Sequence, residues 1–392
     1  MTKKPQPNWH AVRFGDVVRN VNAVERKPLE NGIERFVGLE HLDPESLHIK
    51  RWGLVADGTT FTRKFVRGQV LFGKRRAYQH KAAVAEFDGI CSSDILVFES
   101  ANDELLPELL PFIVQSDGFF ERALGTSAGS LSPRTKWKDL ATYEFALPPL
   151  DEQRRIAEIL WAADEAVEKY RLVLEHSRSL KSATVESVVT GKLKQKEKLM
   201  GELVLDVQYG TSTRSGAKKN CSVPVLRIPN IFKGGLDLSD LSWAVLTAEE
   251  KDRYAVQEGD ILLVRTNGNP AYVSRSVAIR DVPKDAVFAS YLIRLRVDRS
   301  YLRSEYLNML LNSDYLRRTL KHEIRSSAGN YNINTQGLKR QRIPLLPLDE
   351  QDKLLEKMSK LDDAISQCEQ HIEKCQELKS QLLNSMLDAK GV

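Results

Sequence analysis

The sequence predicts a mixed α/β (α+β) chain in which two similar globular domains each lead into one long helix. The main observation is a repeat, because the segment LPPLDEQ at 147–153 returns as LLPLDEQ at 345–351. The offset is 198 residues (349 − 151) in a chain of 392, and the match continues without a gap to Ser187 and Ser385. A stripe of apolar residues with coiled-coil spacing follows both copies. A repeat of about half the chain length indicates a tandem duplication.

The repeat predicts four regions. Residues 1–148 and 199–346 are expected to be globular, and each precedes a helical region. The first helical region, 149–198, includes a linker, and the second is 347–392.

Each globular domain is predicted to contain the same series of elements. A buried strand, 68–73 in the first domain and 259–264 in the second, leads into a basic or amide-rich loop. The remaining elements are, in order, a second strand-like run (90–98 and 288–295), a helical segment (104–122 and 303–321) and a loop of small residues (127–132 and 327–332).

Both helical regions carry apolar residues at alternating spacings of three and four, which is typical of a coiled-coil seam. Acidic residues just after a proline favour a helix start at Asp151 and Asp349, because they lie at the positive end of the helix dipole. The seam residues include Ile156, Leu160, Val167 and Leu174 in the first helix and Leu354, Leu361, Ile365 and Ile372 in the second.

Each helix has roughly 40 residues and a length of about 60 Å, and its seam needs a partner. The helices can pair within the chain, pair with other chains, or lie on their own globular domains. Antiparallel pairing within the chain is favoured over these and over a solvent-bridging helix. Cys368, His371 and Cys375 share one helical face, but both cysteines occupy seam positions where cysteine behaves as a small hydrophobe. We therefore expect no metal site.

The loops of the globular domains hold the candidate DNA-binding residues. Arg, Asn and Gln side chains read base edges, whereas Ser, Lys and backbone N–H groups hold phosphates, and Gly lets the backbone approach closely. Ordinary hairpin turns remain the alternative interpretation. The candidates are Lys74, Arg75, Arg76, Tyr78, Ser127, Gly129, Ser130, Arg134 and Lys136 in the first domain, and Arg265, Thr266, Asn267, Asn269, Arg275, Gly329, Asn330, Tyr331, Asn332, Asn334 and Lys339 in the second.

The charge distribution agrees with a polyanionic partner such as DNA. Residues 200–348 hold 22 Lys and Arg against 15 Asp and Glu, whereas 349–392 hold 6 against 10. An ordinary solvated face would also explain this balance. The chain has no apolar run near the ~18 residues of a membrane span and no apolar core of a signal peptide at its start. Four cysteines without CxxC spacing argue against a disulfide framework, so we expect a cytoplasmic protein with no membrane association.

Motifs for catalysis are missing from the sequence. The segment Asn269-Pro270-Ala271-Tyr272 is one residue from the Asn-Pro-Pro-aromatic motif of amino-group DNA methyltransferases, but no glycine-rich nucleotide loop accompanies it. P-loop, HExxH and GxSxG motifs do not occur. The sequence therefore predicts a protein that is not an enzyme. A stand-alone enzyme and a coiled-coil protein without a DNA role remain as rival classes.

Over nearly its whole length the chain resembles the specificity (S) subunits of type I restriction–modification systems. The two Leu-Asp-Glu-Gln helices carry the resemblance, together with the segments 72–78, 127–137, 264–270 and 327–338. The resemblance implies two target-recognition domains separated by an antiparallel helical spacer with pseudo-two-fold symmetry. Each domain would read one half of a bipartite, asymmetric target in double-stranded DNA.

The same resemblance implies partners and cofactors. The family binds two DNA methyltransferase (M) subunits, which use S-adenosylmethionine to methylate adenine N6, and two motor-nuclease (R) subunits. S-adenosylmethionine, ATP and Mg would belong to those partners, and this chain would hold no cofactor and no active site. The helices would set the spacer between the half-sites and dock the methyltransferase subunits.

Overall fold

The computed structural model describes residues 9–190, 196–218, 220, 222–327 and 329–387. The chain divides into two compact units. Unit 1 contains Met1–Leu172 and Glu369–Val392, and unit 2 contains Val173–Cys368. Each unit therefore combines one globular part with about half of each long helix. None of the described helices is long and apolar enough to cross a membrane.

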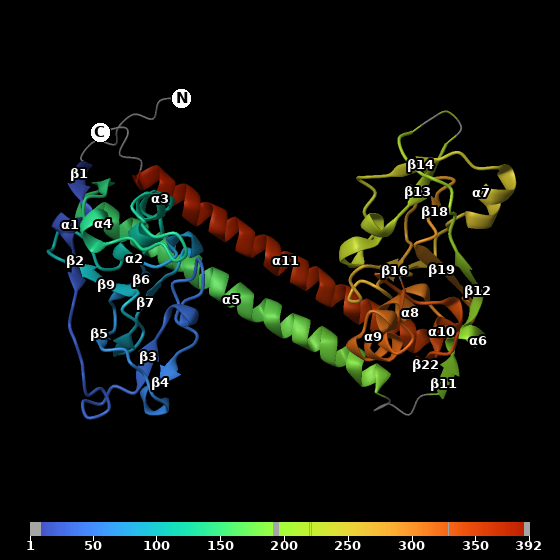
Figure 1. Ribbon diagram of the computed structural model, residues 1–392, viewed down its shortest axis with the longest axis horizontal. Helices are drawn as coiled ribbons and strands as arrows, with labels where there is room; N and C mark the ends of the chain where they lie inside the picture. Colours follow the sequence, from blue (N-terminus) through green and yellow to red (C-terminus); the bar gives the residue numbers. More distant parts are fainter. Residues whose placement is uncertain (1–8, 191–195, 219, 221, 328, 388–392) are drawn as a thin grey trace. The chain divides into compact units, whose positions relative to one another are not determined.

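Unit 1 is built on two four-stranded sheets, and Figure 1 shows α1 to α4 at one end of this unit and β3, β4 and β5 at the other. The first sheet is antiparallel in the order β2-β9-β6-β7, and the second has the order β4-β3-β8-β5 with β3 parallel to β8. Buried phenylalanines such as Phe72 and Phe98 fill the core beneath the first sheet. The strands are β1 (His10–Arg13), β2 (Val18–Val21), β3 (Arg35–Val37), β4 (Gly53–Leu54), β5 (Arg63–Phe65), β6 (Val70–Gly73), β7 (Ala82–Val84), β8 (Gly89–Cys91), β9 (Ile95–Ser100) and β10 (Glu144–Leu147), and the short helices are α1 (Phe14–Val17), η1 (Leu39–His41), η2 (Val55–Asp57), η3 (Ala77–Gln79), α2 (Leu110–Gln115), α3 (Asp117–Gly125) and α4 (Trp137–Leu140).

Unit 2 repeats this architecture. Its four-stranded antiparallel sheet has the order β12-β19-β15-β17, and a three-stranded sheet, β14-β13-β18, takes the place of the second sheet. The strands are β11 (Lys196–Leu199), β12 (Val204–Tyr209), β13 (Val223–Leu226), β14 (Ser242–Ala244), β15 (Asp260–Val264), β16 (Thr266–Asn267), β17 (Ser276–Ala278), β18 (Val287–Phe288), β19 (Leu292–Val297), β20 (Arg325–Ser327), β21 (Asn330–Asn332) and β22 (Arg342–Leu345), and the short helices are α6 (Met200–Leu203), η4 (Ile228–Gly234), α7 (Ala248–Tyr254), α8 (Ser304–Leu311), α9 (Asp314–Lys321) and α10 (Thr335–Lys339).

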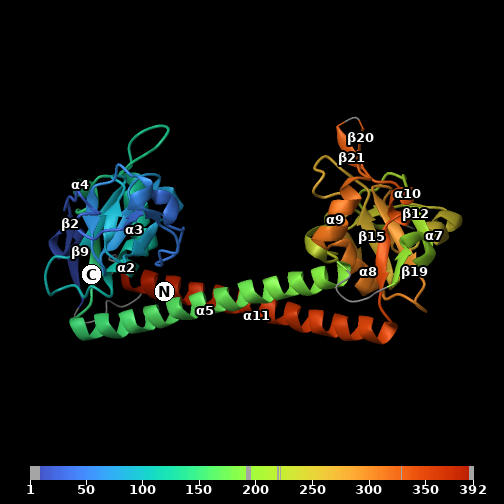
Figure 2. The ribbon, with the colours of Figure 1, turned by 90° about the horizontal axis from the view of Figure 1, so that it is seen from below.

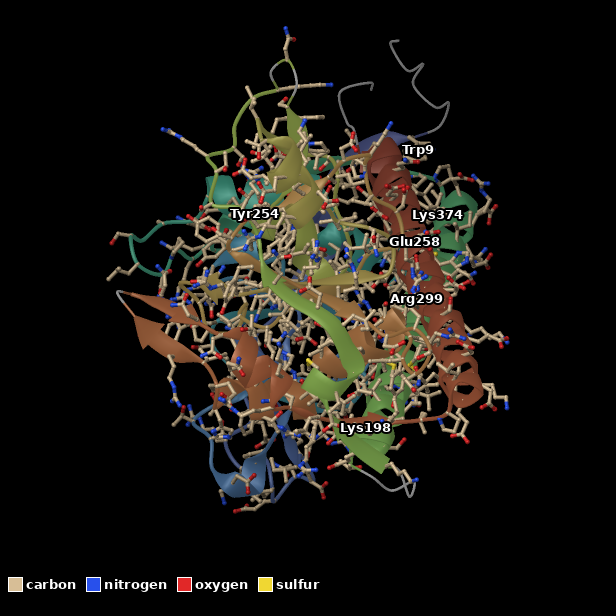
Figure 3. The ribbon with its side chains drawn as sticks, turned by 90° about the vertical axis from the view of Figure 1, so that its right-hand side faces the viewer. Trp9, Lys198, Tyr254, Glu258, Arg299 and Lys374 are labelled. Carbon is tan, nitrogen blue, oxygen red and sulfur yellow. The ribbon has the colours of Figure 1, made fainter. Side chains whose placement is uncertain are left out.

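The buried strands that follow Gly68 and Gly259 are confirmed as β6 and β15. Both glycines have positive φ angles, +89° and +85°, which favour glycine. At Gly259 the terminal Nη2 of the flexible Arg299 side chain also lies close, 2.0 Å from where an added Cβ would be. That nitrogen donates to the carbonyl of Glu258 at 3.5 Å, and Figure 3 shows both residues on one face of unit 2.

Two predictions of single elements are wrong in both units. The runs 90–98 and 288–295 are each two strands in different sheets, β8 and β9 or β18 and β19, because a tight turn interrupts each run. In unit 1 the turn is closed by the N–H of Ile95, which donates to the Ser92 carbonyl at 3.0 Å. In unit 2 the N–H of Leu292 donates to the Ala289 carbonyl at 2.9 Å. An apolar run alone does not reveal such a turn.

The predicted helical segments 104–122 and 303–321 are each two helices, α2 and α3 or α8 and α9. Ser116 and Ser313 have extended backbones between them, and each Oγ accepts the N–H three residues later at 3.3 Å. A serine in this conformation ends one helix and caps the next. The first segment also begins at Leu110, six residues later than expected.

The long helices are α5 (Leu150–Val189) and α11 (Leu348–Leu387), and they pack against each other in the antiparallel sense that the sequence predicted. In unit 1 Lys379 of α11 donates to Asp164 of α5, and in unit 2 Lys181 of α5 donates to Asp362 of α11. Within unit 1 the ring of Tyr170 also stacks on that of His371, so the residue number rises along α5 as it falls along α11 and this half of the pair is antiparallel.

Parts of the helices also lie on the globular cores, so two of the three predicted arrangements occur together. Ile156 and Leu160 belong to the core of unit 1, and Leu354 and Leu361 pack against the core of unit 2. Val167 is buried, and the remaining predicted seam residues are half-buried: Leu174, Ile365 and Ile372.

A buried glutamine from the repeated motif joins each helix to its globular part. Gln153 is 1% exposed, and its Nε2 donates to the carbonyls of Glu104 and Pro148 at 2.7 and 2.8 Å. Its Oε1 accepts the N–H of Leu106 at 2.9 Å. Gln351 makes the same three bonds, to the carbonyls of Tyr301 and Leu346 and from the N–H of Arg303, each at 2.8 Å. The repeated amide thus satisfies buried backbone groups, a structural role that the motif itself did not reveal.

Candidate nucleic-acid interface

In unit 1 the end of β6 joins the two candidate loops into one surface, here called platform 1 and defined as residues 74–78 and 127–136. The N–H of Lys74 donates to the Asp94 carbonyl at 3.0 Å, and the Lys74 carbonyl accepts the N–H of Thr135 at 3.0 Å. Arg75 pairs with Arg134, which also pairs with Ala128, in antiparallel bridges. Loops about 60 residues apart in sequence therefore lie side by side, as a common binding surface requires.

Asp94 organises the charged side chains of platform 1. Its Oδ1 accepts Nε of Arg134 at 2.8 Å, and its Oδ2 accepts Nη2 of Arg134 at 3.4 Å and Nη1 of Arg75 at 3.3 Å. Nη2 of Arg75 donates to Oγ of Ser132 at 3.0 Å. Burial acts to raise the pKa of Asp94, but the bonds and charges of Arg134 and Arg75 outweigh it and lower the pKa. Asp94 was not among the predicted residues, because nothing in its local sequence indicates a partner 40 positions away.

The remaining residues of platform 1 differ in accessibility. Burial, with the nearby charge of Arg63, lowers the pKa of the half-buried Lys74. Arg76 has a left-handed backbone (φ +55°), and its N–H donates to the Pro133 carbonyl at 2.8 Å. Ser127 is half-buried, with its Oγ donating to the Ala123 carbonyl at 2.7 Å. The predicted residues of platform 1 that are exposed are Tyr78, Gly129, Ser130, Arg134 and Lys136.

Unit 2 has an equivalent surface, here called platform 2 and defined as residues 265–269 and 325–334 without residue 328. The N–H of Arg265 donates to the Tyr291 carbonyl at 2.9 Å, and the Arg265 carbonyl accepts the N–H of Ile333 at 3.0 Å. These two bonds match the two backbone bonds of Lys74. Where platform 1 has only isolated bridges beside these bonds, platform 2 has a three-stranded sheet in the order β16-β21-β20. Figure 2 shows β20 and β21 projecting from the rest of unit 2.

The matching bonds define equivalent positions that carry different side chains. Arg75 corresponds to Thr266, because each directly follows the residue that makes the matching bonds. Arg75 pairs with Arg134, and Thr266 pairs with Asn332. Arg134 therefore corresponds to Asn332, and Asp94 corresponds to Tyr291. The two platforms share a backbone framework and present unlike chemical groups.

Several predicted residues of platform 2 have partners inside the protein. The guanidinium of Arg265 lies 4.3 Å from the ring centroid of Tyr209, and its Nη1 donates to the Ser290 carbonyl at 3.3 Å. Oδ1 of Asn267 accepts the N–H of Asn269 at 2.9 Å, and Oδ1 of Asn269 accepts the N–H of Ala271 at 3.0 Å. Oδ1 of Asn334 caps α10 by accepting the N–H of Gly337 at 2.7 Å. Gly329 and Asn330 are exposed, whereas Thr266, Tyr331 and Asn332 are half-buried.

Two predicted residues of unit 2 lie outside platform 2. Nε of Arg275 donates to the Ala271 carbonyl at 3.3 Å, and its guanidinium lies 4.2 Å from the Tyr272 ring centroid. Nη2 of Arg317 donates to the same carbonyl at 2.5 Å, and burial and then Arg275 lower the pKa of Arg317. Both arginines line a cleft of about 1220 Å³ within unit 2. Lys339 lies beside α6, since an added Cβ at Gly201 would be 3.2 Å from its Cβ.

Ion pairs with α5 anchor the globular part of unit 1. Nε2 of His48 bonds Oδ2 of Asp164 at 2.8 Å, Nδ1 bonds Oε1 of Glu86 at 2.9 Å, and Nζ of Lys50 lies 2.5 Å from Oε2 of Glu168. The bond to Asp164 raises the pKa of His48, burial lowers it, and the bond to Glu86 raises it further. The resulting pKa is about 9. The sequence offered no sign of this contact.

Comparison with known proteins agrees with this arrangement. A model of the family described as type I restriction modification DNA specificity domain matches residues 49–174 and 204–377. The specificity subunit of the type I restriction enzyme EcoKI from Escherichia coli (strain K12) is 22% identical, over 73% of this chain and 64% of that protein. The specificity subunit of StySPI from Salmonella potsdam is 24% identical, over 65% of this chain and 58% of that protein.

A solved structure shares the fold over the whole chain. The S subunit of a type I restriction-modification system from M. genitalium covers 99% of both chains with a TM-score of 0.63 and 14% sequence identity. The chain spans less than two thirds of the length of the EcoKI and StySPI subunits. Because the family model matches well over half of the residues, in two segments that follow the internal repeat, this chain belongs to the family of type I restriction modification DNA specificity proteins.

Proposed function

We propose that this chain is the sequence-specific DNA-recognition subunit of a type I restriction–modification complex and has no catalytic activity of its own. The observation that carries the proposal is the pair of equivalent platforms, in which the same backbone bonds present Arg75, Arg134 and Asp94 in one unit and Thr266, Asn332 and Tyr291 in the other. Unlike side chains on one framework suit the reading of two unlike half-sites, so the target is bipartite and asymmetric.

The proposal assigns a role to each region. Residues 1–148 and 199–346 are the two target-recognition domains, and 149–198 and 347–392 are the spacer helices with their linker. The predicted loop residues contact double-stranded DNA, the helices set the spacer, and two methyltransferase subunits dock on them. Two motor-nuclease subunits complete the complex in the cytoplasm. S-adenosylmethionine, ATP and Mg are used by the partners.

The physical advantage of two domains is discrimination. One domain reads a few base pairs, too few to be distinctive in a genome, and each mismatch costs only about 1–3 kcal/mol. Tethering a second domain makes the second binding event intramolecular, which multiplies affinity and selectivity through effective concentration.

A methylome tests the proposal. The full chain is expressed with a type I methyltransferase subunit of its host, and N6-methyladenine is mapped by long-read sequencing. We expect a motif of two different short halves around a fixed non-specific spacer. Exchanging residues 329–332 of platform 2 for those of another specificity subunit changes one half and leaves the other intact. A continuous motif, or methylation independent of this chain, contradicts the proposal.

The same preparation separates the rival classes. The purified chain, supplied with S-adenosylmethionine, ATP and Mg but without partners, is expected neither to methylate nor to cut DNA. Turnover by the chain alone would indicate an enzyme. A complex with the methyltransferase that lacks salt-sensitive DNA binding would indicate a coiled-coil interaction protein.

A further inference from the structure

The side chain of Arg134 in platform 1 is held along one edge and open along the other. A guanidinium group offers two pairs of parallel donors, a side-on pair (Nε and Nη2) and an end-on pair (Nη1 and Nη2). Asp94 accepts the side-on pair, at 2.8 and 3.4 Å. Nη1 has no protein partner within the part of the chain that the structure describes, and Nη2 uses only one of its two N–H groups for Asp94, so one N–H on each of these nitrogens stays open along the end-on edge. The side chain is 48% exposed. The geometry therefore presents a fixed fork of donors to a ligand.

Asp94 is itself firmly held. Its carboxylate is 16% exposed, and Arg75 supplies a second counter-ion at 3.3 Å. Its N–H donates to Oγ of Ser92 at 3.2 Å, and its carbonyl accepts the N–H of Lys74 at 3.0 Å. Since Arg75 also bonds Ser132, the carboxylate joins both loops of platform 1 to the end of β6. Such a cluster fixes the rotamer of Arg134 before any ligand arrives.

The pair of Asp94 and Arg134 occurs in unit 1 and has no equivalent among the described residues at the matching positions of unit 2. In platform 2 the position of Asp94 is taken by Tyr291, which is 58% exposed, and the position of Arg134 by Asn332. Unit 2 therefore has neither the fork nor the carboxylate at these positions.

We propose that Arg134 is a specificity-determining residue, which reads the guanine of a G·C pair in the half-site of the first domain. Asp94 is its positioning residue. This inference rests on the proposed function. The O6 and N7 acceptors of guanine in the major groove match two parallel N–H donors, and no other base offers two acceptors there. A guanidinium that is already fixed loses less side-chain entropy when it binds. Ion pairing with Asp94 also reduces the net charge of the fork, which favours base reading over phosphate contact.

The test uses the full chain in complex with its methyltransferase subunit and a duplex library randomised at both half-sites. The variants are D94N, R134Q and R134K, with E323Q as the matched control. Glu323 accepts Nη2 of Arg340 at 2.7 Å and is 23% exposed, so this control removes a similar ion pair outside platform 1.

We expect the unmodified complex to require a G·C pair at one position of one half-site. D94N and R134Q lower that preference by roughly 5- to 150-fold, the range of one bidentate contact. R134Q leaves every other position unchanged, whereas D94N also releases Arg75 from its ion pair. R134K loses the preference but keeps the salt dependence of binding, because its charge remains without the planar fork. E323Q keeps the full motif.

Two results would overturn the inference: a half-site without that G·C requirement, or an unaltered or uniformly weakened motif in R134Q. If D94N does not fold, R134Q and R134K decide, because both leave Asp94 paired with Arg75. An unmodified complex that shows no bipartite motif refutes the proposed function as well, whereas a normal motif that R134Q leaves intact refutes this inference alone.

Discussion

Lys379 donates a hydrogen bond to Asp164 across the two helices of unit 1, and both side chains are largely buried, at 12% and 7% exposed. The repeat offset of 198 residues converts this pair into Asp362 and Lys181, which bond in unit 2 with their helices exchanged. There Lys181 is 36% exposed and Asp362 is 55% exposed. The duplicated contact thus occurs once in a buried and once in an exposed setting, which makes each pair the control for the other.

Removing the lysine should cost more stability in unit 1 than in unit 2. K379A leaves Asp164 buried with His48 as its remaining partner, and we expect a loss of about 3 kcal/mol. K181A removes the partner of Asp362, which is already accessible to solvent, and we expect a loss of stability of less than about 1 kcal/mol. Urea unfolding followed by circular dichroism measures both. Equal losses would contradict the role of burial.

The stability of unit 1 should fall as the solution becomes alkaline. The pKa of His48 rises from an ordinary value of 6.5 to about 9 in the folded protein, chiefly through its bond to Asp164. The protonated histidine therefore contributes its full stabilisation below about pH 6.5, and the contribution disappears as the pH rises to about 9. H48Q should remove this slope between pH 6.5 and 9. A parallel pH profile for wild type and H48Q would show that the ion pair has no such effect.

Replacing the repeated glutamine should destabilise both units to a similar degree. Q153L leaves the N–H of Leu106 and two buried carbonyls without their partner, and Q351L does the same around Arg303. We expect about 2–3 kcal/mol from each, since unsatisfied buried groups are costly. The unfolding midpoints of Q153L, Q351L and Q79L are compared, because Gln79 is half-buried and outside both joints. Wild-type stability of Q153L would rule out this role.

An exposed lysine of platform 1 should contribute charge without sequence information. K136Q is expected to reduce the slope of log K against log salt by about 1, and to leave the methylated motif unchanged. K360Q, which alters a lysine paired with Glu356 on α11, is the control and should leave the slope unchanged. An altered motif in K136Q would show that Lys136 reads bases.

Lengthening both helices should lengthen the spacer between the half-sites. Inserting seven residues after Leu172 and after Gln370 keeps the seam in phase, because these positions are separated by the repeat offset. Seven helical residues add about 10 Å, or about three base pairs of DNA. The methylome of the double insertion measures the spacer. An unchanged spacer would show that the helices do not set it.

The elements that the repeat predicts correctly are those whose signal is local. The seams around Ile156 and Leu354, and the buried strands after Gly68 and Gly259, depend on periodicity or on one backbone angle. The turns after Ser92 and Ala289 were missed because apolar residues continue on both sides of them. Asp94 and His48 were missed for another reason: their partners, Arg134 and Asp164, lie far away in the sequence, and no local pattern records such a pairing.

The joints at Gln153 and Gln351 recognise only main-chain groups of the globular part, two carbonyls and one N–H in each unit. Main-chain groups are present whatever side chains a domain carries. A domain of quite different sequence can therefore form the same hydrogen bonds with this glutamine, provided that its backbone follows the same turn. On the proposed function, this joint would allow one recognition domain to be exchanged for another at the same helix start, and a new DNA target would then arise by recombination at the ends of the helices.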